Sequence, residues 1–540
     1  MLFQPNFKTY SGYLNANSNG TWKLHYMLTE SRNNPEQAPL LFWFNGGPGC
    51  SSFSGSFEEL GPFYIYKDGK SIYENVYSWN YQANVLYLES PVGTGYSYST
   101  DDPHYHKADD DQSLEQNLHA LKDFFSRVMP KYQNRPFFLS GESYAGVYLP
   151  MLGAAITNGT LDGSFPNKNF AGIAIGNGFM DVPGLTNSLI LWSNYHGRIS
   201  LDNWERLKKP DCCNTTSDID SCDWTQNLES QNRIDFVGKN TPCGNILNDI
   251  INATGLYPAL DPYNYYEDCY IGSQITWFAK PRRHYRGIRD ETNDPNYFQN
   301  PANLINRDST DNMWGYPCWQ ENYVFTYFND PSVQTAFHID QAWMNAKINF
   351  SDCNADLYNQ YINKYNTMDQ FFDTILKNIE NPTYPVKNFR ILIYNGDVDT
   401  VCNFLGDSKF IKKVSDRNGF TSNNRTRWWY RTNIAGFYQT YSSKSSRTTI
   451  DVLTVKGAGH MVPMDRAGPS QQMITNFMLY NGSIVDYSYN KNINENPTPI
   501  PLLNNNSSTQ PTGAGISQKP LAVTIITALC FILFTKVNCW

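Results

Sequence analysis

The chain has 540 residues, with 42 Lys and Arg against 50 Asp and Glu, and its formal net charge at pH 7 is -8. This length suits one large α/β domain that carries an insertion better than a minimal single core. The mild acidic excess and the lack of a basic stripe argue against nucleic acid as a partner.

The predicted elements, in chain order, are typical of an α/β fold. The first 180 residues contain an expected hairpin (10–28), two apolar strands (40–44 and 84–91), a helix with apolar residues at helical spacing (110–129), and two more strands (137–139 and 171–178). From about 181 to 323 the pattern is irregular, polar and cysteine-rich, which we interpret as an insertion that caps the core. Two further strands (389–394 and 449–455) and a closing helix (469–480) indicate that the core then resumes.

The C-terminal tail suggests attachment to a membrane. Residues 521–534 are apolar, but they are fewer than the about 20 residues that a spanning helix needs. Small residues at 506–508, a polar spacer and this run fit a signal for a glycolipid (GPI) anchor, and a short stop-transfer helix is the alternative. The expected domains are a first core half (1–180), a cap insertion (181–323), a second core half (324–482), a disordered polar linker (483–519) and a hydrophobic tail (520–540).

The residues Gly141-Glu142-Ser143-Tyr144-Ala145-Gly146 suit a sharp turn between a buried strand and a helix. Gly141 allows a turn so tight that Ser143 is pushed out at its apex, as in the nucleophile elbow of α/β-hydrolases. The helix behind it directs N–H groups toward the apex, where they favour negative charge. An ordinary strand-to-helix turn is the alternative, since short Gly-x-Ser patterns also arise by chance.

An earlier loop predicts a binding site for an oxyanion. The strand 40–44 runs into Asn45-Gly46-Gly47-Pro48-Gly49-Cys50-Ser51-Ser52, a rigid loop whose N–H groups can point at a ligand. α/β-Hydrolases draw half of their oxyanion hole from a loop at this place in the chain. A plain turn is the alternative.

Three polar residues lie just beyond predicted strand ends: Ser143, an aspartate at 397 or 399, and His460. The carboxyl ends of parallel strands form the functional edge of a sheet, and the order Ser, Asp, His is that of α/β-hydrolases. Histidine can take the proton of the serine hydroxyl near neutral pH, while a buried aspartate fixes its tautomer and stabilises the imidazolium. Together these residues predict a serine hydrolase with an α/β-hydrolase fold, a mostly parallel sheet and helices on both faces.

Cysteines and glycosylation triplets point to an oxidising, secretory compartment. Five of the 11 cysteines lie between Cys212 and Cys269, and nine asparagines begin an Asn-x-Ser/Thr triplet: Asn19, Asn158, Asn214, Asn252, Asn349, Asn424, Asn481, Asn505 and Asn506. The first residues show no signal peptide, so either the chain is cytosolic or its start is truncated, and we favour truncation. The basic run 282–289 suits either a solvated loop or a protease-sensitive processing site.

Four blocks, in order along the chain, resemble the signature blocks of the serine carboxypeptidase family, of the cathepsin A and carboxypeptidase Y type. The blocks are Asn45–Ser52, Gly141–Gly146, Asn395–Asp399 and Gly457–Pro463, and the resemblance covers about residues 5–482. It implies that Ser143 is the nucleophile, His460 the general base and Asp399 its partner, which leaves Asp397 as a loop residue. Gly47 and Tyr144 would supply the N–H groups of the oxyanion hole. No metal or cofactor is implied.

The resemblance also implies how a peptide is recognised. Asn45, Gly46, Glu59 and Glu142 match the family's group that binds the terminal carboxylate of a substrate. Two glutamates would repel a carboxylate unless they share a proton, so that one can donate a hydrogen bond. We therefore expect best peptidase activity at acidic pH. Surface salt bridging by the two glutamates is the alternative.

Resemblance to the cathepsin A branch implies a disulfide pairing that spacing alone does not give. The expected bonds are Cys50–Cys353, Cys212–Cys243, Cys213–Cys222 and Cys269–Cys318, with Cys402 free in the cleft and Cys530 and Cys539 in the tail.

The leading hypothesis is a serine-type carboxypeptidase of the secretory pathway, lysosomal or extracellular, that removes C-terminal residues through an acyl-enzyme. Its expected partners are peptide or protein C-termini, and the sequence leaves open whether the chain forms a homodimer. An acyltransferase would keep the site but pass the acyl group to an alcohol or amine. A non-catalytic protective or binding role is a third hypothesis, and a generic esterase would leave the carboxylate-binding group without a purpose.

Overall fold

The computed structural model describes residues 3–65, 69–214, 218–230, 236–251, 260–266, 321–491, 493, 497, 499 and 500. The chain divides into two compact units, Met1–Leu502 and Leu503–Trp540. The predicted hydrophobic tail and the basic run 282–289 lie outside the described residues. Within the described part, no helix combines the length and the apolar character that crossing a lipid bilayer requires.

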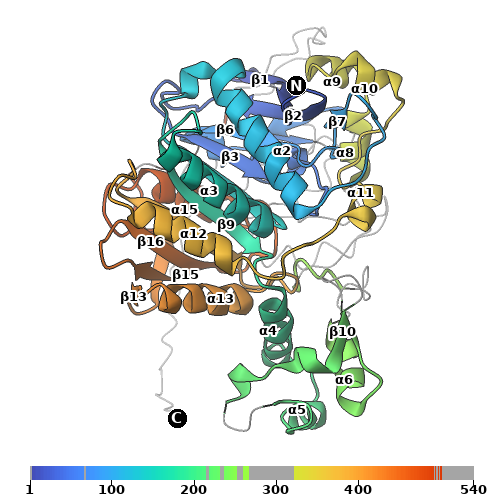
Figure 1. Ribbon diagram of the computed structural model, residues 1–540, viewed down its shortest axis with the longest axis vertical. Coiled ribbons are helices and arrows are strands. Elements are labelled where there is room, and N and C mark those ends of the chain that lie inside the picture. The colour runs from blue at the N-terminus through green and yellow to red at the C-terminus, as the bar shows by residue number, and fades with distance from the viewer. Residues whose placement is uncertain are drawn as a thin grey trace, which may run out of the picture. The chain divides into compact units, whose positions relative to one another are not determined.

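A mixed sheet runs through the first unit, and its 12 described strands include the order β1-β2-β6-β3-β8-β9-β12-β16-β15-β13, with β7 pairing to β2 and β14 to β15 (Figure 1). The strands are β1 (Thr9–Asn15), β2 (Trp22–Thr29), β3 (Leu40–Phe44), β6 (Asn84–Leu88), β7 (Tyr98–Ser99), β8 (Phe137–Ser143), β9 (Phe170–Gly178), β12 (Phe389–Gly396), β13 (Thr421–Ser422), β14 (Thr426–Tyr430), β15 (Asn433–Ser442) and β16 (Thr448–Val455). The six central strands, from β6 to β16, are parallel. Their burial on both faces explains their nearly continuous apolar sequences. The opening hairpin and the predicted strands are confirmed.

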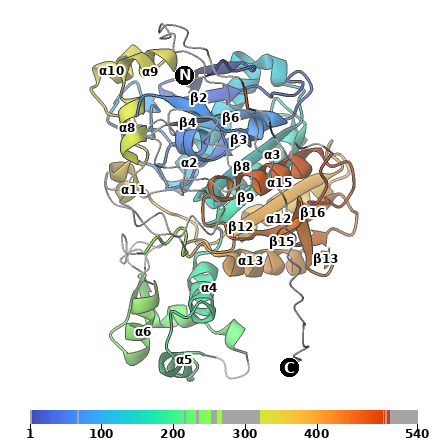
Figure 2. The same cartoon turned by 180° about the vertical axis from the view of Figure 1, so that it is seen from behind.

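Helices cover both faces of the sheet, as predicted (Figures 1 and 2). One face carries α2 (Asp110–Asp123), α3 (Ala145–Asp162), α12 (Asp369–Glu380) and α13 (Phe404–Arg417), and the other carries α15 (Ala467–Leu479). Alternate strand residues supply two cores: Leu139 and Ile393 pack on the α3 side, whereas Phe138 and Leu392 pack on the α15 side. The helix predicted over 110–129 is α-helical only as far as Asp123, and a π-helical turn (Phe124–Val128) continues it.

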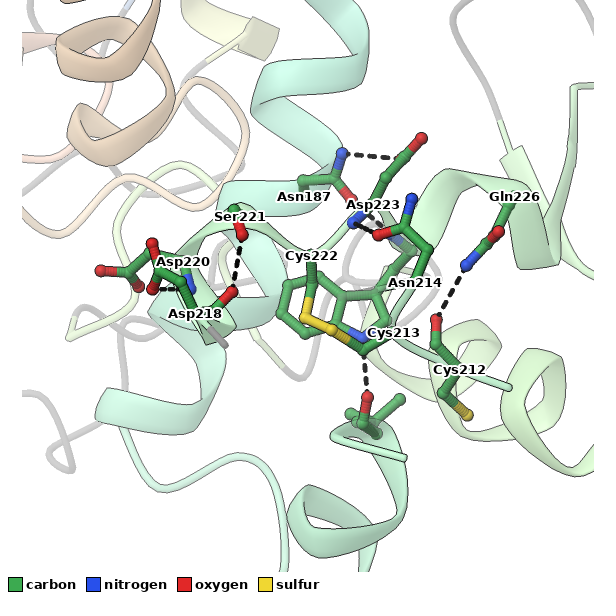
Figure 3. The surroundings of a disulfide bond; sticks show 12 residues. Asn187, Cys212, Cys213, Asn214, Asp218, Asp220, Ser221, Cys222, Asp223 and Gln226 are labelled. Atoms are coloured by element: carbon green, nitrogen blue, oxygen red, sulfur yellow. Dashed lines mark hydrogen bonds between the residues drawn. A yellow bond between two sulfur atoms is a disulfide. The ribbon is translucent and has the colours of Figure 1, made fainter. Parts of the chain in front are cut away.

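The insertion has more regular structure than its sequence suggested. It contains α4 (Val182–Tyr195), α5 (Leu201–Leu207), α6 (Pro242–Ile251) and the short pair β10 (Leu228–Ser230) and β11 (Phe236–Gly238). Its own small core gathers around Trp224 and the bonds Cys212–Cys243 and Cys213–Cys222. Figure 3 shows Asn187 of α4 bonded to this region, where Trp224 N donates to its Oδ1 at 2.8 Å. Two disulfides and this small core stabilise the insertion, whereas sequence patterns detect long periodic stretches.

The remaining elements are short. They are α1 (Ser52–Ser54), a π-helical turn (Gly55–Glu59), β4 (Phe63–Ile65), β5 (Ile72–Glu74), α8 (Glu321–Phe328), α9 (Pro331–Ala336), α10 (Gln341–Asn345), α11 (Ala355–Gln360), α14 (Val462–Asp465) and single turns of 3-10 helix at Trp79–Tyr81, Pro130–Tyr132, Ile219–Ser221 and Trp224–Asn227.

The core extends beyond its predicted end at residue 482. Val485 and Tyr487 are buried, and the Tyr487 hydroxyl donates to Asp451 Oδ2 at 2.7 Å. The prediction that a disordered linker begins at 483 is therefore wrong for this stretch. Two apolar side chains anchor it within a segment whose overall composition is that of a linker.

Candidate active site

Ser143, the last residue of β8, sits in a strained turn. Its φ of 60° lies in the left-handed region that side chains rarely adopt. Gly141 makes the turn possible, because a Cβ there would lie 2.3 Å from Phe44 O and 2.7 Å from Ala145 Cβ. Helix α3 begins at Ala145, directly behind the apex. This is the geometry of a nucleophile elbow.

The loop after β3 approaches the elbow closely. A Cβ on Gly46 would lie 2.5 Å from the backbone nitrogen of Tyr144 and 2.6 Å from Ser143 Cβ, so only glycine fits there. Gly47 follows with a φ of 106°, again a glycine conformation. The loop is tied down by Ser52 Oγ, which donates to Leu88 O at 2.6 Å. The loop that carries Gly47 thus approaches the backbone of Tyr144, the residue predicted to supply the second N–H group of the oxyanion hole.

His460 and Asp399 form a buried pair beyond β16 and β12. His460 Nδ1 lies 2.7 Å from Asp399 Oδ2, and both side chains are almost fully buried. Because the carboxylate can only accept, Nδ1 carries the hydrogen and Nε2 is left as the base. Nε2 is buried, and nothing in the described part of the chain hydrogen-bonds to it.

The structure distinguishes between the two candidate aspartates. Asp397 accepts from Gly457 N at 2.7 Å and so braces the loop after β16. Asp399 instead faces His460, and its carboxylate also accepts from the backbone nitrogens of Val401 at 2.9 Å and Cys402 at 3.0 Å. Asp399 is therefore the aspartate placed to act with His460.

Two opposing effects act on the pKa of His460. Burial lowers the pKa of the imidazole, but the charge of Asp399 and the hydrogen bond to it raise the pKa, and they prevail. Glu59 and Asp261 add smaller contributions in the same direction. The pKa of His460 is therefore raised, and removing a negative charge nearby would lower it again.

Glu59 and Glu142 meet beside the elbow. Asn45 Nδ2 donates to Glu59 Oε1 at 3.2 Å and to Glu142 Oε1 at 3.0 Å, so that one amide group bridges the two buried carboxyl groups. Two carboxyl groups this close together in a buried place resist double ionisation, because their negative charges repel each other. Burial raises the pKa of Glu59 to about 7, and burial together with the charge of Glu59 raises the pKa of Glu142 well above its usual range. The pair therefore holds a proton under acidic conditions.

The comparisons with known proteins agree with this geometry. The family model for serine carboxypeptidases matches residues 1–480. The chain belongs to this family. It is 51% identical over 536 residues to the serine carboxypeptidase ctsa-3.1 of Caenorhabditis elegans, covering 94% of this chain and 92% of that protein. It is 34% identical to the lysosomal protective protein of Mus musculus, covering 88% and 91%.

A solved structure shares the fold. The prohormone-processing carboxypeptidase Kex1 of Saccharomyces cerevisiae matches with a TM-score of 0.58 and 21% identity, over 88% of this chain and 91% of that one. The predicted α/β-hydrolase fold is confirmed, and the protein is a serine-type carboxypeptidase.

Two buried residues of this serine carboxypeptidase lie beside Asp399. Asn177, which sequence analysis missed, has a φ of 39° and donates from Nδ2 to Asp399 Oδ2 at 3.0 Å and to Cys402 O at 3.1 Å. Its position at the end of a predicted strand was the only signal that could have drawn attention to it. Cys402 is the free cysteine that the family resemblance implied, and burial raises the pKa of its thiol. The thiol is therefore held in its unreactive protonated form.

Apart from the free Cys402, the described cysteines of the carboxypeptidase form three disulfides, Cys50–Cys353, Cys212–Cys243 and Cys213–Cys222. The first ties the oxyanion loop to the segment before α11. The fourth expected bond, Cys269–Cys318, lies outside the described residues. Six of the glycosylation asparagines are exposed: Asn19, Asn158, Asn214, Asn349, Asn424 and Asn481. Asn252, Asn505 and Asn506 lie outside the described residues, so glycosylation stays a prediction.

Proposed function

We propose that this carboxypeptidase releases the C-terminal residue of a peptide through an acyl-enzyme formed on Ser143. The observation that carries the proposal is the joint placement of the His460–Asp399 pair, the elbow and the glutamate pair at one edge of the sheet. His460 Nε2 takes the proton of Ser143 Oγ as the oxygen attacks the scissile carbonyl. The N–H groups of Gly47 and Tyr144 stabilise the oxyanion, each contributing about 3–4 kcal/mol.

The second half of the reaction returns the enzyme to its starting state. Protonated His460 gives its proton to the leaving amine, so that the C–N bond breaks and an amino acid departs. His460 then takes a proton from water, whose oxygen attacks the ester carbonyl. It gives that proton to Ser143 Oγ as the ester C–O bond breaks and the shortened peptide leaves. Asp399 stabilises the imidazolium in both halves.

Recognition of the substrate carboxylate is the task we assign to Asn45, Gly46, Glu59 and Glu142. A protonated Glu59–Glu142 pair can donate a hydrogen bond to a carboxylate, whereas two ionised glutamates would repel it. Such recognition restricts cleavage to the last peptide bond. It also disfavours an acyltransferase or a generic esterase, for which a free C-terminal carboxylate has no role.

The pH dependence follows from the proton on this pair. As pH rises past about 7, Glu59 loses its proton and the pair gains a negative charge, so KM for peptides should increase and kcat/KM should fall. Protonation at lower pH removes the charge of Glu59, which otherwise raises the pKa of His460, and so keeps more of the base neutral. We therefore expect peptide hydrolysis to be best on the acidic side of pH 7.

The variant Glu59→Gln tests this coupling, because an amide stays neutral and can still donate. In this variant, kcat/KM for peptides should fall much less above pH 7 than it does in the wild type. The kcat/KM for a substrate without a free carboxylate should change little. If the wild-type profile for peptides stays high well above neutral pH, the proposed role of the shared proton is wrong.

We also propose that the protein works in the secretory pathway or the lysosome. The disulfides of the described chain and its exposed glycosylation asparagines support this location, as does similarity to a lysosomal protective protein. A mass shift after enzymatic deglycosylation of the protein made in animal cells would support passage through this pathway, and an unmodified chain would contradict it.

A further inference from the structure

A short stretch of the insertion, residues 260–266, lies directly against both catalytic loops, and we name it the insertion clasp. Tyr263 O accepts from His460 N at 2.7 Å. Pro262 O accepts from Thr400 N at 3.1 Å and from Thr400 Oγ1 at 2.6 Å, next to Asp399. Tyr265 N donates to Val398 O at 3.1 Å, on the other side of Asp399. The clasp therefore joins the loop of the base to the loop of its partner.

A second contact fixes the clasp to Asp465, the last residue of α14. Asn264 Nδ2 donates to Asp465 Oδ2 at 3.0 Å, and the same oxygen accepts from Gly459 N at 2.7 Å. The approach is close, since a Cβ on Gly459 would lie 2.2 Å from Tyr263 O. The residue before His460 must be glycine for the clasp to sit here.

The ring of Tyr263 covers the imidazole of His460. The two ring centroids are 4.9 Å apart, with 50° between the planes. His460 is only 3% exposed, whereas Tyr263 is 40% exposed, so the tyrosine lies on the solvent side of the pair. Asp261 is buried behind it and accepts from Tyr263 N at 2.9 Å. Its charge adds to those that raise the pKa of His460.

We propose that Tyr263 is a positioning residue for His460, and that the insertion clasp is a working part of the catalytic apparatus rather than of the cap alone. This inference rests on the proposed role of His460 as the base for Ser143. The clasp holds the backbone of His460 in place, and the Tyr263 ring limits the rotation of the imidazole and its exposure to water. Catalysis therefore depends on the insertion even for substrates too small to touch it.

The experiment measures the rate at which a small phosphonofluoridate modifies Ser143, as a function of pH. The serine oxygen displaces fluoride while His460 takes the proton, and the reagent has no carboxylate for the glutamate pair. Tyr263→Ala should slow the modification by about 10- to 100-fold, as expected for a misplaced base. The acid limb of the pH–rate profile, where the rate rises with pH as His460 loses its proton, should also move to higher pH in this variant. Burial lowers the pKa of His460, and the variant removes part of that burial.

Three further variants separate positioning from general damage. Tyr263→Phe keeps the ring and should behave like the wild type. Tyr195→Ala removes an exposed tyrosine of α4, in the insertion but outside the clasp, and should leave rate and acid limb unchanged. The near-isosteric Thr400→Val removes one hydrogen bond to Pro262 O and should slow the modification by about fivefold.

The outcomes decide between the proposals. A slower rate with a shifted acid limb in Tyr263→Ala supports the clasp, whereas a profile like that of the wild type and Tyr195→Ala overturns it. If Tyr263→Ala fails to fold, Thr400→Val decides, and an unchanged rate in that variant overturns the inference. If the wild-type protein is not modified at Ser143 at all, the proposed function fails instead.

Discussion

Replacing Ser143 by alanine is expected to lower kcat for peptide hydrolysis by about 10⁶-fold, the loss typical of removing a serine nucleophile from a triad. No acyl-enzyme can form without Oγ, and His460 then has no hydroxyl to activate. Binding through the glutamate pair and the oxyanion loop should survive, so the affinity for a peptide product should change little. Steady-state kinetics and product binding to both proteins measure the two effects.

Ser140→Ala provides the matched control, since Ser140 lies in β8 three residues before the apex and is fully buried. This variant should keep nearly all activity. Should Ser143→Ala retain more than a small fraction of the wild-type kcat after purification from a host lacking other carboxypeptidases, the serine mechanism would be contradicted.

Asp399→Asn is expected to reduce kcat by about 10³- to 10⁴-fold. Three donors meet at Asp399 Oδ2, from His460, Asn177 and Cys402, so the amide oxygen should occupy this position and keep the histidine tautomer. The negative charge that stabilises the imidazolium is nevertheless lost. The new amide hydrogens would also face Val401 N, itself a donor to Oδ1.

Loss of the charge should also appear in the pH profile. Because Asp399 raises the pKa of His460, the acid limb of the remaining activity should move to lower pH in Asp399→Asn. Asp397→Asn is the control, since this carboxylate braces Gly457 instead of the imidazole. It should keep most of the activity, and equal losses in the two variants would show that the roles of the aspartates are assigned wrongly.

The parallel core and the nucleophile elbow were predictable because their physical signals are local. β3 is wholly apolar over Leu40–Phe44 since a central parallel strand is buried on both faces. Ser143 could be recognised because a tight turn needs small neighbours such as Gly141. Residue patterns of this kind report on conformation within a few positions of the chain.

Contacts between distant segments left no such pattern. Tyr263 lies in an irregular polar stretch, and only the folded chain brings it to His460. Asn177 likewise depends on the approach of β9 to the loop after β12. The hairpin of β14 and β15 was not predicted, and neither were the helices α4 to α6, which pack on a small core that contains two disulfides.

The measurement that tests the account most directly compares a blocked dipeptide with its C-terminally amidated twin, from about pH 4.5 to pH 7.5, using the wild type and Ser143→Ala. The account predicts that the wild type cleaves the free acid far better than the amide, with the advantage shrinking as the pH approaches and passes about 7, where Glu59 loses its proton. Ser143→Ala should cleave neither substrate. Equal cleavage of acid and amide by the wild type at every pH would contradict carboxylate recognition by the glutamate pair, and with it the central claim.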